Sequence, residues 1–276
     1  MRDIVVVTGT GGMGLSVARR LGSGRRLLLA DYAPANLDRA TDLLRSEGHD
    51  VHSHHVDVAD QRSVHELADA AAALGTIQAV VHTAGLSPAM ANPERILAVD
   101  LLGTVHMLDA FERHASPGRV LVAIASIAGH LAGFLTPEHE RRLATSAATD
   151  LLKLSSEVLA TVAEITPENA YALAKRGAQL RVQAASAPWA ERGARVVSIS
   201  PGLVSTPMGQ LEIAPGADGT AADANQILAV ATRLGTPDDI AAAVEWLASP
   251  AASFITGTDL RIDGGAVATI RWATDR

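Results

Sequence analysis

The chain contains 276 residues, of which 48% are hydrophobic, and it carries a net charge of −7 at pH 7 with no cysteine. This length and apolar content suit one large α/β domain with a substantial core. The acidic balance argues against a surface that binds nucleic acid or anionic membranes, because both require clustered Lys and Arg. The lack of cysteine excludes disulfides, thiolate catalysis and Cys-ligated metals. We therefore expect a small molecule or another subunit as the partner.

Targeting and membrane-spanning segments are not expected. Strand-like residues begin at Ile4, which leaves no room for a signal peptide. Even the Ala-rich stretch 67–74 is far shorter than the roughly 18 apolar residues that a membrane helix needs. The sequence thus predicts a cytoplasmic protein that does not bind a membrane.

Strand-like and helix-like stretches alternate along the chain. Short β-branched or aliphatic runs predict strands at 3–9, 25–31, 51–58, 77–85, 118–126, 194–202 and 260–265. Helix-like stretches lie between several of them, at 14–22, 33–48, 60–75 and 236–249. The alternation predicts an α/β fold with a doubly wound, mainly parallel sheet of about seven strands and helices on both faces. No linker or repeat divides the chain, so we expect a single domain over residues 1–276.

The first predicted strand ends in a glycine-rich turn that opens a helix. Gly9, Gly11 and Gly14 stand in G-x-G-x-x-G register within "TGTGGMG". Glycines there permit a tight turn and let the backbone approach a pyrophosphate, which sits at the positive end of the helix. On the first strand of a parallel pattern, this loop predicts a Rossmann-type dinucleotide-binding fold.

Asp31 ends the second predicted strand, about 20 residues after the glycines. A carboxylate at this position can accept hydrogen bonds from ribose hydroxyls, and it would repel a 2′-phosphate. No Arg or Lys follows Asp31 directly to offset that repulsion. The sequence therefore predicts NAD(H) as the cofactor in preference to NADP(H). The structural alternative is that Asp31 caps the following turn.

The segment 129–169 interrupts the alternation because it holds no strand candidate. Four apolar residues recur there at helical spacing, namely Leu151, Leu154, Val158 and Val162. This stripe predicts an inserted amphipathic helix, buried either in the same subunit as a pocket wall or against a partner subunit. A further helix is expected to start at Thr166 and Pro167.

Tyr171 and Lys175 lie four residues apart in "YALAK", and therefore on one face of that further helix. A free phenol titrates at about 10, but a cation within about 4–6 Å favours the phenolate, and Lys175 and the positive ring of oxidised nicotinamide would supply that field. Such a phenol can give a proton to a ketone, or take one from an alcohol, as hydride moves to or from a nicotinamide. The structural alternative is a surface tyrosine beside a solvated lysine.

These features resemble the classical short-chain dehydrogenase/reductase family over nearly the whole chain. The matching stretches are "VTGTGGMG" (7–14), "HVDVAD" (55–60), "HTAG" (82–85), "AIASIAG" (123–129), "YALAK" (171–175), "SISPGLVSTPM" (198–208) and the block 233–265 that ends in "DGG". The resemblance implies that Ser126 hydrogen-bonds the substrate oxygen, that Tyr171 is the acid or base, and that Lys175 also binds the nicotinamide ribose. The cofactor contacts implied by the glycine loop and the resemblance are Gly9, Gly11, Gly12, Met13, Gly14, Asp31, Asp57, Val58, Ala84, Gly85, Tyr171, Lys175, Pro201, Gly202, Val204 and Thr206.

The sequence departs from the family pattern in three places. The glycine loop is one residue shorter than usual, which implies an altered helix start at Met13. Asp100 stands where the family has a catalytic asparagine, and it can accept a hydrogen bond in a proton relay or pair with Lys175. Ser126 and Tyr171 are 45 residues apart because of the segment 129–169. That insertion is similar to one in some bacterial hydroxysteroid dehydrogenase/carbonyl reductases.

We expect an oxidoreductase that interconverts a secondary alcohol and a ketone with NAD(H), and the resemblance implies a homodimer or homotetramer. The substrate pocket should come from the insertion and the loop 209–226, with Met13 and Met208 beside the cofactor. The alternatives are a non-catalytic NAD-binding sensor or scaffold and a sugar-nucleotide epimerase or dehydratase. Only 11 residues follow "DGG", which leaves no room for the usual substrate domain of the latter. No metal site is expected, and the histidines of "VHSHHV" (51–56) are interpreted as structural.

Overall fold

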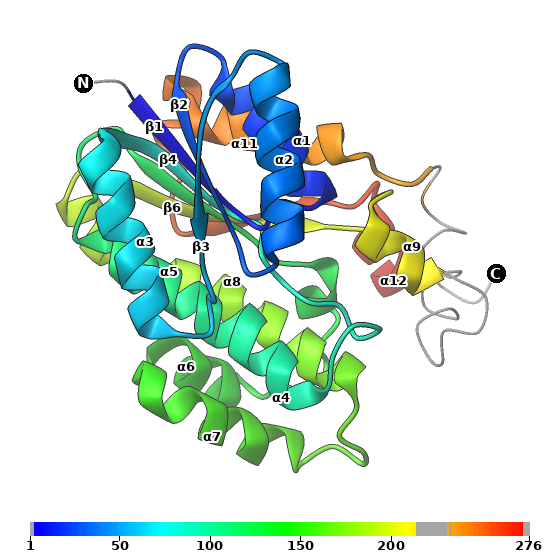
Figure 1. The fold of residues 1–276 in the computed structure, drawn as a ribbon. Helices are drawn as coiled ribbons and strands as arrows, with labels where there is room; N and C mark the ends of the chain where they lie inside the picture. Colours follow the sequence, from blue (N-terminus) through cyan, green and yellow to red (C-terminus); the bar gives the residue numbers. More distant parts are fainter. Residues whose placement is uncertain (1–2, 214–230, 232, 273–276) are drawn as a thin grey trace.

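The computed structural model describes residues 3–213, 231 and 233–272, and its centre is a seven-stranded sheet (Figure 1). The strands are β1 (Asp3–Thr8), β2 (Arg26–Asp31), β3 (Asp50–His55), β4 (Thr76–His82), β5 (Val120–Ile124), β6 (Arg195–Pro201) and β7 (Thr258–Ile262). They run in the order β3-β2-β1-β4-β5-β6-β7, and all neighbouring pairs are parallel. The strand order reverses between β1 and β4, so the crevice beyond their carboxyl ends is a topological switch point, where doubly wound folds bind ligands.

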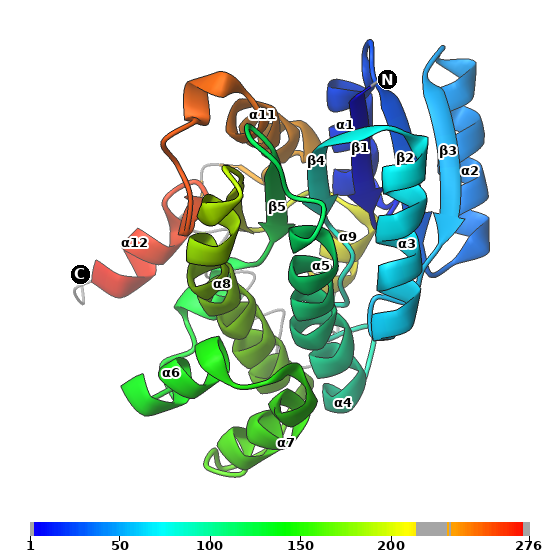
Figure 2. The same ribbon diagram turned by 90° about the vertical axis from the view of Figure 1, so that its left-hand side faces the viewer.

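Helices cover both faces of the sheet, which confirms the predicted doubly wound architecture. One face carries α1 (Gly12–Gly22), α2 (Pro34–Ser46) and α11 (Pro237–Ala248). The other carries α3 (Gln61–Leu74), α5 (Gly103–Glu112) and α8 (Pro167–Glu191), which lie side by side in Figure 2. Every residue of β5 and β6 is buried between these layers, which explains why both strands are rich in aliphatic side chains.

The remaining described elements lie between and after these strands and helices. They are α4 (Pro93–Ile96), a π-helical segment (Leu97–Leu102), a 3₁₀ turn (Ile127–His130), α6 (Pro137–Thr145), α7 (Ala148–Leu159), α9 (Pro207–Ile213), a second 3₁₀ turn (Pro250–Ala252) and α12 (Ala266–Trp272). In the π-helical segment the Gly103 N–H donates to the carbonyl of Ala98, five residues earlier. The segment joins α4 to α5 without a break in the helix.

The insertion 129–169 contains two helices, α6 and α7, and the predicted apolar stripe belongs to α7. Leu151, Leu154 and Val158 lie on α7, are at most 2% exposed, and pack in a cluster with apolar residues of α5, α6 and α8. The stripe is therefore buried within the same chain. Val162 lies beyond the end of α7 and is only partly buried, so its inclusion in the helix was wrong. Figure 1 shows α6 and α7 below α8, on the side away from the sheet.

Several element ends differ from the prediction by a few residues. The last strand ends at Ile262, because the Asp263 carboxylate accepts the N–H groups of Gly265 and Val267 and starts the turn into α12. The first helix begins at Gly12, two residues before the predicted start. The predicted pocket loop 209–226 lies outside the described residues from 214 onward. No helix in the described ranges combines the length and apolarity needed to cross a bilayer.

Candidate active site

The glycine loop lies where β1 ends and α1 begins. Gly9 has a φ of +81°, and a Cβ there would come within 2.6 Å of the Ala84 nitrogen. A Cβ at Gly14 would overlap the carbonyl oxygen of Gly9, because α1 packs directly over the turn. Among the described residues no side chain caps the first turn of α1, and that turn carries no acid. Its N–H groups therefore fit a pyrophosphate, and the open space at Gly11 leaves room for one.

Asp31 connects the glycine loop to the end of β2. Its Oδ2 accepts from the N–H and the hydroxyl of Thr10 at 2.6 and 2.8 Å, and its Oδ1 accepts from the Ala33 N–H at 2.9 Å. A carboxylate offers about four lone-pair sites, so one acceptor site remains. Asp31 is partly exposed, which leaves that site accessible to a ribose hydroxyl. It also caps the following turn, so the structural and functional interpretations are compatible.

Asp57 and Val58 follow β3 at the same edge of the sheet. Val58 is 4% exposed, and Asp57 pairs with Arg95 at 3.2 Å. The Arg95 guanidinium also lies 5.3 Å from the ring centroid of Tyr32, the residue after Asp31. Neither Arg95 nor Tyr32 was predicted as a site residue, since no motif connects α4 with the end of β2.

Lys175 and Asp100 form a buried ion pair beneath the loop after β4. Lys175 Nζ lies 2.7 Å from Asp100 Oδ1, and the two side chains are 7% and 0% exposed. The other carboxylate oxygen accepts from the Leu86 N–H at 3.0 Å. A Cβ on Gly85 would come within 2.6 Å of the carboxylate, so the glycine lets the pair pack against the backbone. Of the two alternatives for Asp100, the structure contains the pairing with Lys175.

Ser126, Tyr171 and Lys175 converge from β5 and α8. Ser126 follows β5, and its Oγ accepts from the Ala128 N–H at 3.2 Å. The start of α8 is fixed by Thr166, whose side chain accepts from the Asn169 N–H, and by Pro167 in the first turn, as predicted. Lys175 Nζ lies 5.4 Å from the Tyr171 ring centroid and 3.4 Å from the Ile124 carbonyl oxygen. Tyr171 and Lys175 thus share one helix face and are not a solvated surface pair.

Burial is the largest influence on the electrostatics of Tyr171. Burial raises the pKa of its phenol to about 12, and the Lys175 ammonium reduces that rise without cancelling it. The charges of Glu212 and Asp100 add to the rise, and a hydrogen bond with Ser126 works against it. Lys175 therefore lowers the pKa of the phenol, in the predicted direction, while burial keeps that pKa above its ordinary value of 10.0.

The charge of Lys175 is maintained by its neighbours. Burial acts to lower the pKa of Lys175, but Asp100 and Tyr171 outweigh it and raise the pKa above 10.5. Burial raises the pKa of the Asp100 carboxyl, while Lys175 and the Leu86 N–H act in the opposite direction. An ammonium group consequently remains behind the Tyr171 ring at neutral pH.

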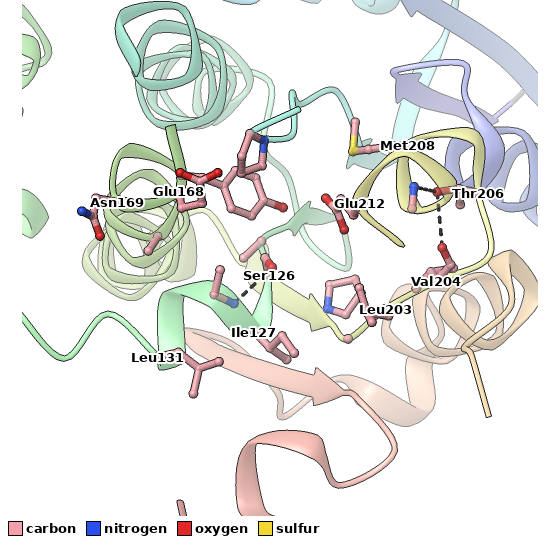
Figure 3. A pocket seen from close by; sticks show the side chains of 18 of the residues that line it. Ser126, Ile127, Leu131, Glu168, Asn169, Leu203, Val204, Thr206, Met208 and Glu212 are labelled. Atoms are coloured by element: carbon pink, nitrogen blue, oxygen red, sulfur yellow. Dashed lines mark hydrogen bonds between the residues drawn. The ribbon is translucent and has the colours of Figure 1, made fainter. Parts of the chain in front are cut away.

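A pocket of about 520 Å³ opens in front of Ser126 and Tyr171 (Figure 3). Its wall includes predicted site residues from three further parts of the chain: Met13, Pro201, Gly202, Val204, Thr206 and Met208. Thr206 accepts the Gly209 N–H at 3.0 Å and so starts α9, which carries Met208 and Glu212. From the insertion, Leu131 and Phe134 line the pocket, as predicted for that segment, but none of the four stripe residues does so.

The sequence interpretation missed a polar network behind Ser126. Gln179 Nε2 donates to the Ser126 carbonyl at 3.1 Å and to Ser200 Oγ at 2.9 Å. Ser200 and His130 both contact the carboxylate of Asp259, at 3.0 and 2.7 Å. Gln179 could have been suspected because it follows Lys175 by four residues on α8, which places it on the same helix face.

The sequence interpretation also missed two acids in the pocket wall, Glu168 and Glu212. Glu212 follows Met208 by four residues on α9, and Met208 was already predicted to lie at the cofactor. This spacing would have indicated that Glu212 shares its helix face. Glu168 precedes Tyr171 by three residues and could have been found by the same argument.

Comparisons with known proteins agree with this geometry. A family model described as "short chain dehydrogenase" matches residues 3–138, and one described as "Enoyl-(Acyl carrier protein) reductase" matches residues 135–267. The chain is 37% identical over 268 residues to "Short-chain dehydrogenase/reductase bsc3" from Alternaria brassicicola, covering 97% of this chain and 96% of that protein. It is 32% identical over 275 residues to "D-threitol dehydrogenase" from Mycolicibacterium smegmatis, covering 95% and 92% of the two chains.

A solved structure with a similar fold is the 3-alpha-hydroxysteroid dehydrogenase from Pseudomonas sp. B-0831 complexed with NADH. It matches with a TM-score of 0.79 at 23% identity, covering 98% of this chain and 99% of that one. The sequence matches extend over both halves of the chain and show an oxidoreductase that acts on CH–OH groups with a nicotinamide cofactor. The chain belongs to the short-chain dehydrogenase/reductase family.

Proposed function

We propose that this protein interconverts a secondary alcohol and a ketone with NAD(H), and that Ser126, Tyr171 and Lys175 are its catalytic set. The observation that carries the proposal is that Ser126 and Tyr171 share the wall of one open pocket, with a buried ammonium behind the phenol. A sensor or scaffold that only binds NAD has no need of a hydroxyl, a phenol and an ammonium converging on a pocket. This convergence favours an enzyme over the non-catalytic alternative.

The cofactor supplies the hydride when it is bound, and residues along the carboxyl edge of the sheet would hold it. The N–H groups at the start of α1 suit the pyrophosphate, and Asp31 suits the adenosine ribose. The loop 201–206, which lines the substrate pocket together with Met13, suits the nicotinamide side. The remaining proposed contacts are Gly9, Gly11, Gly12, Gly14, Asp57, Val58, Ala84, Gly85, Tyr171 and Lys175.

The proton moves through Tyr171. In ketone reduction the Ser126 hydroxyl donates a hydrogen bond to the substrate oxygen, and the Tyr171 phenol delivers the proton to it. A pKa of about 12 keeps this phenol protonated at neutral pH, which suits a proton donor. Alcohol oxidation needs the phenolate, and the Lys175 ammonium is the fixed charge that favours it. Asp100 acts through Lys175, because it holds the ammonium in place.

The preference for NAD(H) rests on Asp31. A carboxylate at the end of the second strand suits a ribose 2′-hydroxyl and would repel the 2′-phosphate of NADP(H). Arg95 stacks on the neighbouring Tyr32, but its guanidinium is engaged by Asp57. NADH should therefore bind more tightly than NADPH, and Asp31→Ala should narrow the difference. Fluorescence titration with both cofactors tests this, and equal or tighter binding of NADPH by the wild type would contradict it.

Turnover of secondary alcohols and ketones, followed by the absorbance of the reduced cofactor, tests the proposed reaction. Tyr171→Phe should lower kcat by at least about 10²-fold, because it removes the acid–base group. It should still bind NADH, since it deletes one oxygen. Tyr32→Phe, which changes the chain's other tyrosine, is the matched control and should keep its turnover. If Tyr171→Phe retained activity, the acid–base role assigned to Tyr171 would be wrong. If the wild type bound NADH tightly but turned over no substrate, the non-catalytic sensor would be favoured.

We also propose that the protein works in the cytoplasm as a homodimer or homotetramer. Large aromatic side chains exposed on the described surface, such as Trp246 and Phe254, support the assembly. Light scattering of the purified protein measures the mass, and a monomer would contradict the proposal. Fractionation of source cells tests the location.

A further inference from the structure

The substrate pocket combines an apolar wall with negative charge. Apolar side chains contribute most of the wall, among them Leu131, Phe134, Leu203 and Ile270. Two carboxylates also line it, Glu168 and Glu212, while no lysine or arginine does so among the described residues. A substrate that fits this wall therefore has an apolar body. Its polar groups face the carboxylate acceptors, and an anionic group on it would find no basic side chain in the described part of the wall.

Of the two carboxylates, Glu212 is the one whose charge acts on the proposed catalytic residues Tyr171 and Lys175. Figure 3 shows it pointing from α9 into the pocket whose opposite side carries Ser126. Besides burial, its charge contributes to the raised pKa of Tyr171, and it adds to the raised pKa of Lys175. Glu212 has no hydrogen-bond or ion-pair partner within the described ranges. It is therefore an acceptor directed at the pocket and left without a donor.

A partly buried acceptor without a donor is an incomplete hydrogen-bonding group. Placing a hydroxyl opposite it completes the pairing, and a bond with an ionised acceptor is stronger than one between neutral groups. Placing a substrate carboxylate there creates like-charge repulsion that the solvent screens poorly. Replacing the hydroxyl by a methyl leaves the carboxylate unpaired, and sites built on a hydrogen bond discriminate strongly against such analogues.

We propose that the pocket selects uncharged, largely apolar substrates with a second hydroxyl near the reacting carbinol, and that this hydroxyl donates to Glu212. Diols, and the hydroxyketones formed from them, are then favoured over simple alcohols and over hydroxy acids. This inference rests on the proposed function, because it names the substrate class of the same pocket. Glu212 acts as a specificity residue, while hydride and proton transfer involve Ser126, Tyr171 and Lys175.

The test uses one ring system with three kinds of substituent. Wild-type kcat/KM with NAD⁺ is measured for cyclohexanol, for the isomeric cyclohexanediols and for the isomeric hydroxycyclohexanecarboxylates. We expect the best diol to exceed both cyclohexanol and every hydroxy acid by at least about tenfold. Aminocyclohexanols form a fourth arm, and a preference for them over the diols would overturn the assignment of a hydroxyl.

Two substitutions separate charge from hydrogen bonding. Glu212→Gln retains an acceptor oxygen and should reduce the discrimination against hydroxy acids at least about fivefold, while the preference for the diol over cyclohexanol remains. Glu212→Leu should remove the preference for the diol but keep the turnover of cyclohexanol. Glu191→Gln, on the exposed end of α8, is the matched control and should leave all ratios unchanged. NADH binding measured by fluorescence should be the same in all variants, which shows that each is folded.

The outcomes distinguish this inference from the proposed function. If turnover depends on Tyr171 but the hydroxy acids match the diols, or if neither Glu212 variant changes a ratio, the substrate class is wrong and the reaction stands. If Glu212→Gln binds NADH but turns over none of the substrates, Glu212 belongs to the chemical step and the specificity role is overturned. If the wild type acts on no alcohol or ketone, the proposed function itself fails.

Discussion

Breaking the Asp100–Lys175 pair should destabilise the protein more than replacing both of its members. The two charges lie 2.7 Å apart in side chains that are 0% and 7% exposed. Removing one partner of a buried pair costs about 3–5 kcal/mol, because it leaves the other charge without compensation. Replacing both by uncharged groups of similar size leaves no buried charge, and such double replacements often change the free energy of unfolding very little.

The coupling between the two side chains can be measured in a double-mutant cycle of Asp100→Asn, Lys175→Met and the variant that carries both substitutions. Each single variant should lose about 3 kcal/mol of the free energy of unfolding, the lower end of that range, because an asparagine still accepts a hydrogen bond and a buried carboxyl can take up a proton. The double variant should lose less than the sum of the singles by at least about 2 kcal/mol. Independent sites add to within about 0.5 kcal/mol, so this coupling is measurable.

Urea unfolding followed by circular dichroism, without cofactor and at mildly alkaline pH, is the assay. Because the folded pKa of Lys175 lies above its ordinary 10.5, the stabilising contribution of the ammonium is fully present below that value and is lost as pH rises through the folded pKa. The coupling should therefore be equal at pH 7.5 and pH 9. Additive losses at both pH values would refute the argument that the pair is a single energetic unit.

Three further predictions follow from the described contacts. Leu154→Ala should lower the free energy of unfolding by about 2–5 kcal/mol, because Leu154 is 2% exposed. As a control, Leu152→Ala should change it by less than about 0.5 kcal/mol, because Leu152 is 37% exposed. Equal losses for the two variants in urea unfolding would contradict this. Gln179→Leu should lower kcat about tenfold with an unchanged cofactor KM, because it releases the Ser126 carbonyl; a fall in cofactor affinity instead would contradict a positioning role. Asp100→Asn should move the alkaline pKa of kcat to lower pH, because burial, then the Glu212 charge and then the Asp100 charge raise the pKa of the Tyr171 phenol. An upward shift in the pH profile would disprove the sign.

The sequence was informative where backbone geometry or a fixed spacing demands particular residues. Gly9 needs a positive φ and Gly14 a direct contact between helix and turn, so the loop had to contain glycines at both places. The position of Asp31 beside the glycine loop was predictable because the carboxyl end of β2 faces the same crevice as that loop. The four-residue spacing of Tyr171 and Lys175 implied a shared face as soon as α8 was assigned.

The features of the site and the fold that could not be predicted from the sequence depend on packing between distant elements. The rise in the pKa of Tyr171 comes first from burial and then from charges on two other elements, Glu212 and Asp100. No spacing around Tyr171 contains that information. The packing of α6 against α7 and α8 was also hidden, because the apolar stripe is on α7 alone and α6 contributes a single fully buried side chain, Leu143.

The π-helical segment has a consequence for comparing related sequences. Its wider turn holds one residue more than an α-helix would, and the hydroxyl of Thr104 in α5 donates to the carbonyl of Asp100 in the segment at 2.8 Å. One residue corresponds to about 100° of helical rotation, so a single deletion between Leu97 and Leu102 would turn Asp100 away from Lys175 or turn the apolar side of α4 out of the core. A one-residue gap at this point in an alignment of relatives therefore signals either a lost Asp100–Lys175 pair or a repacked α4, even where the acid and the lysine are both still present.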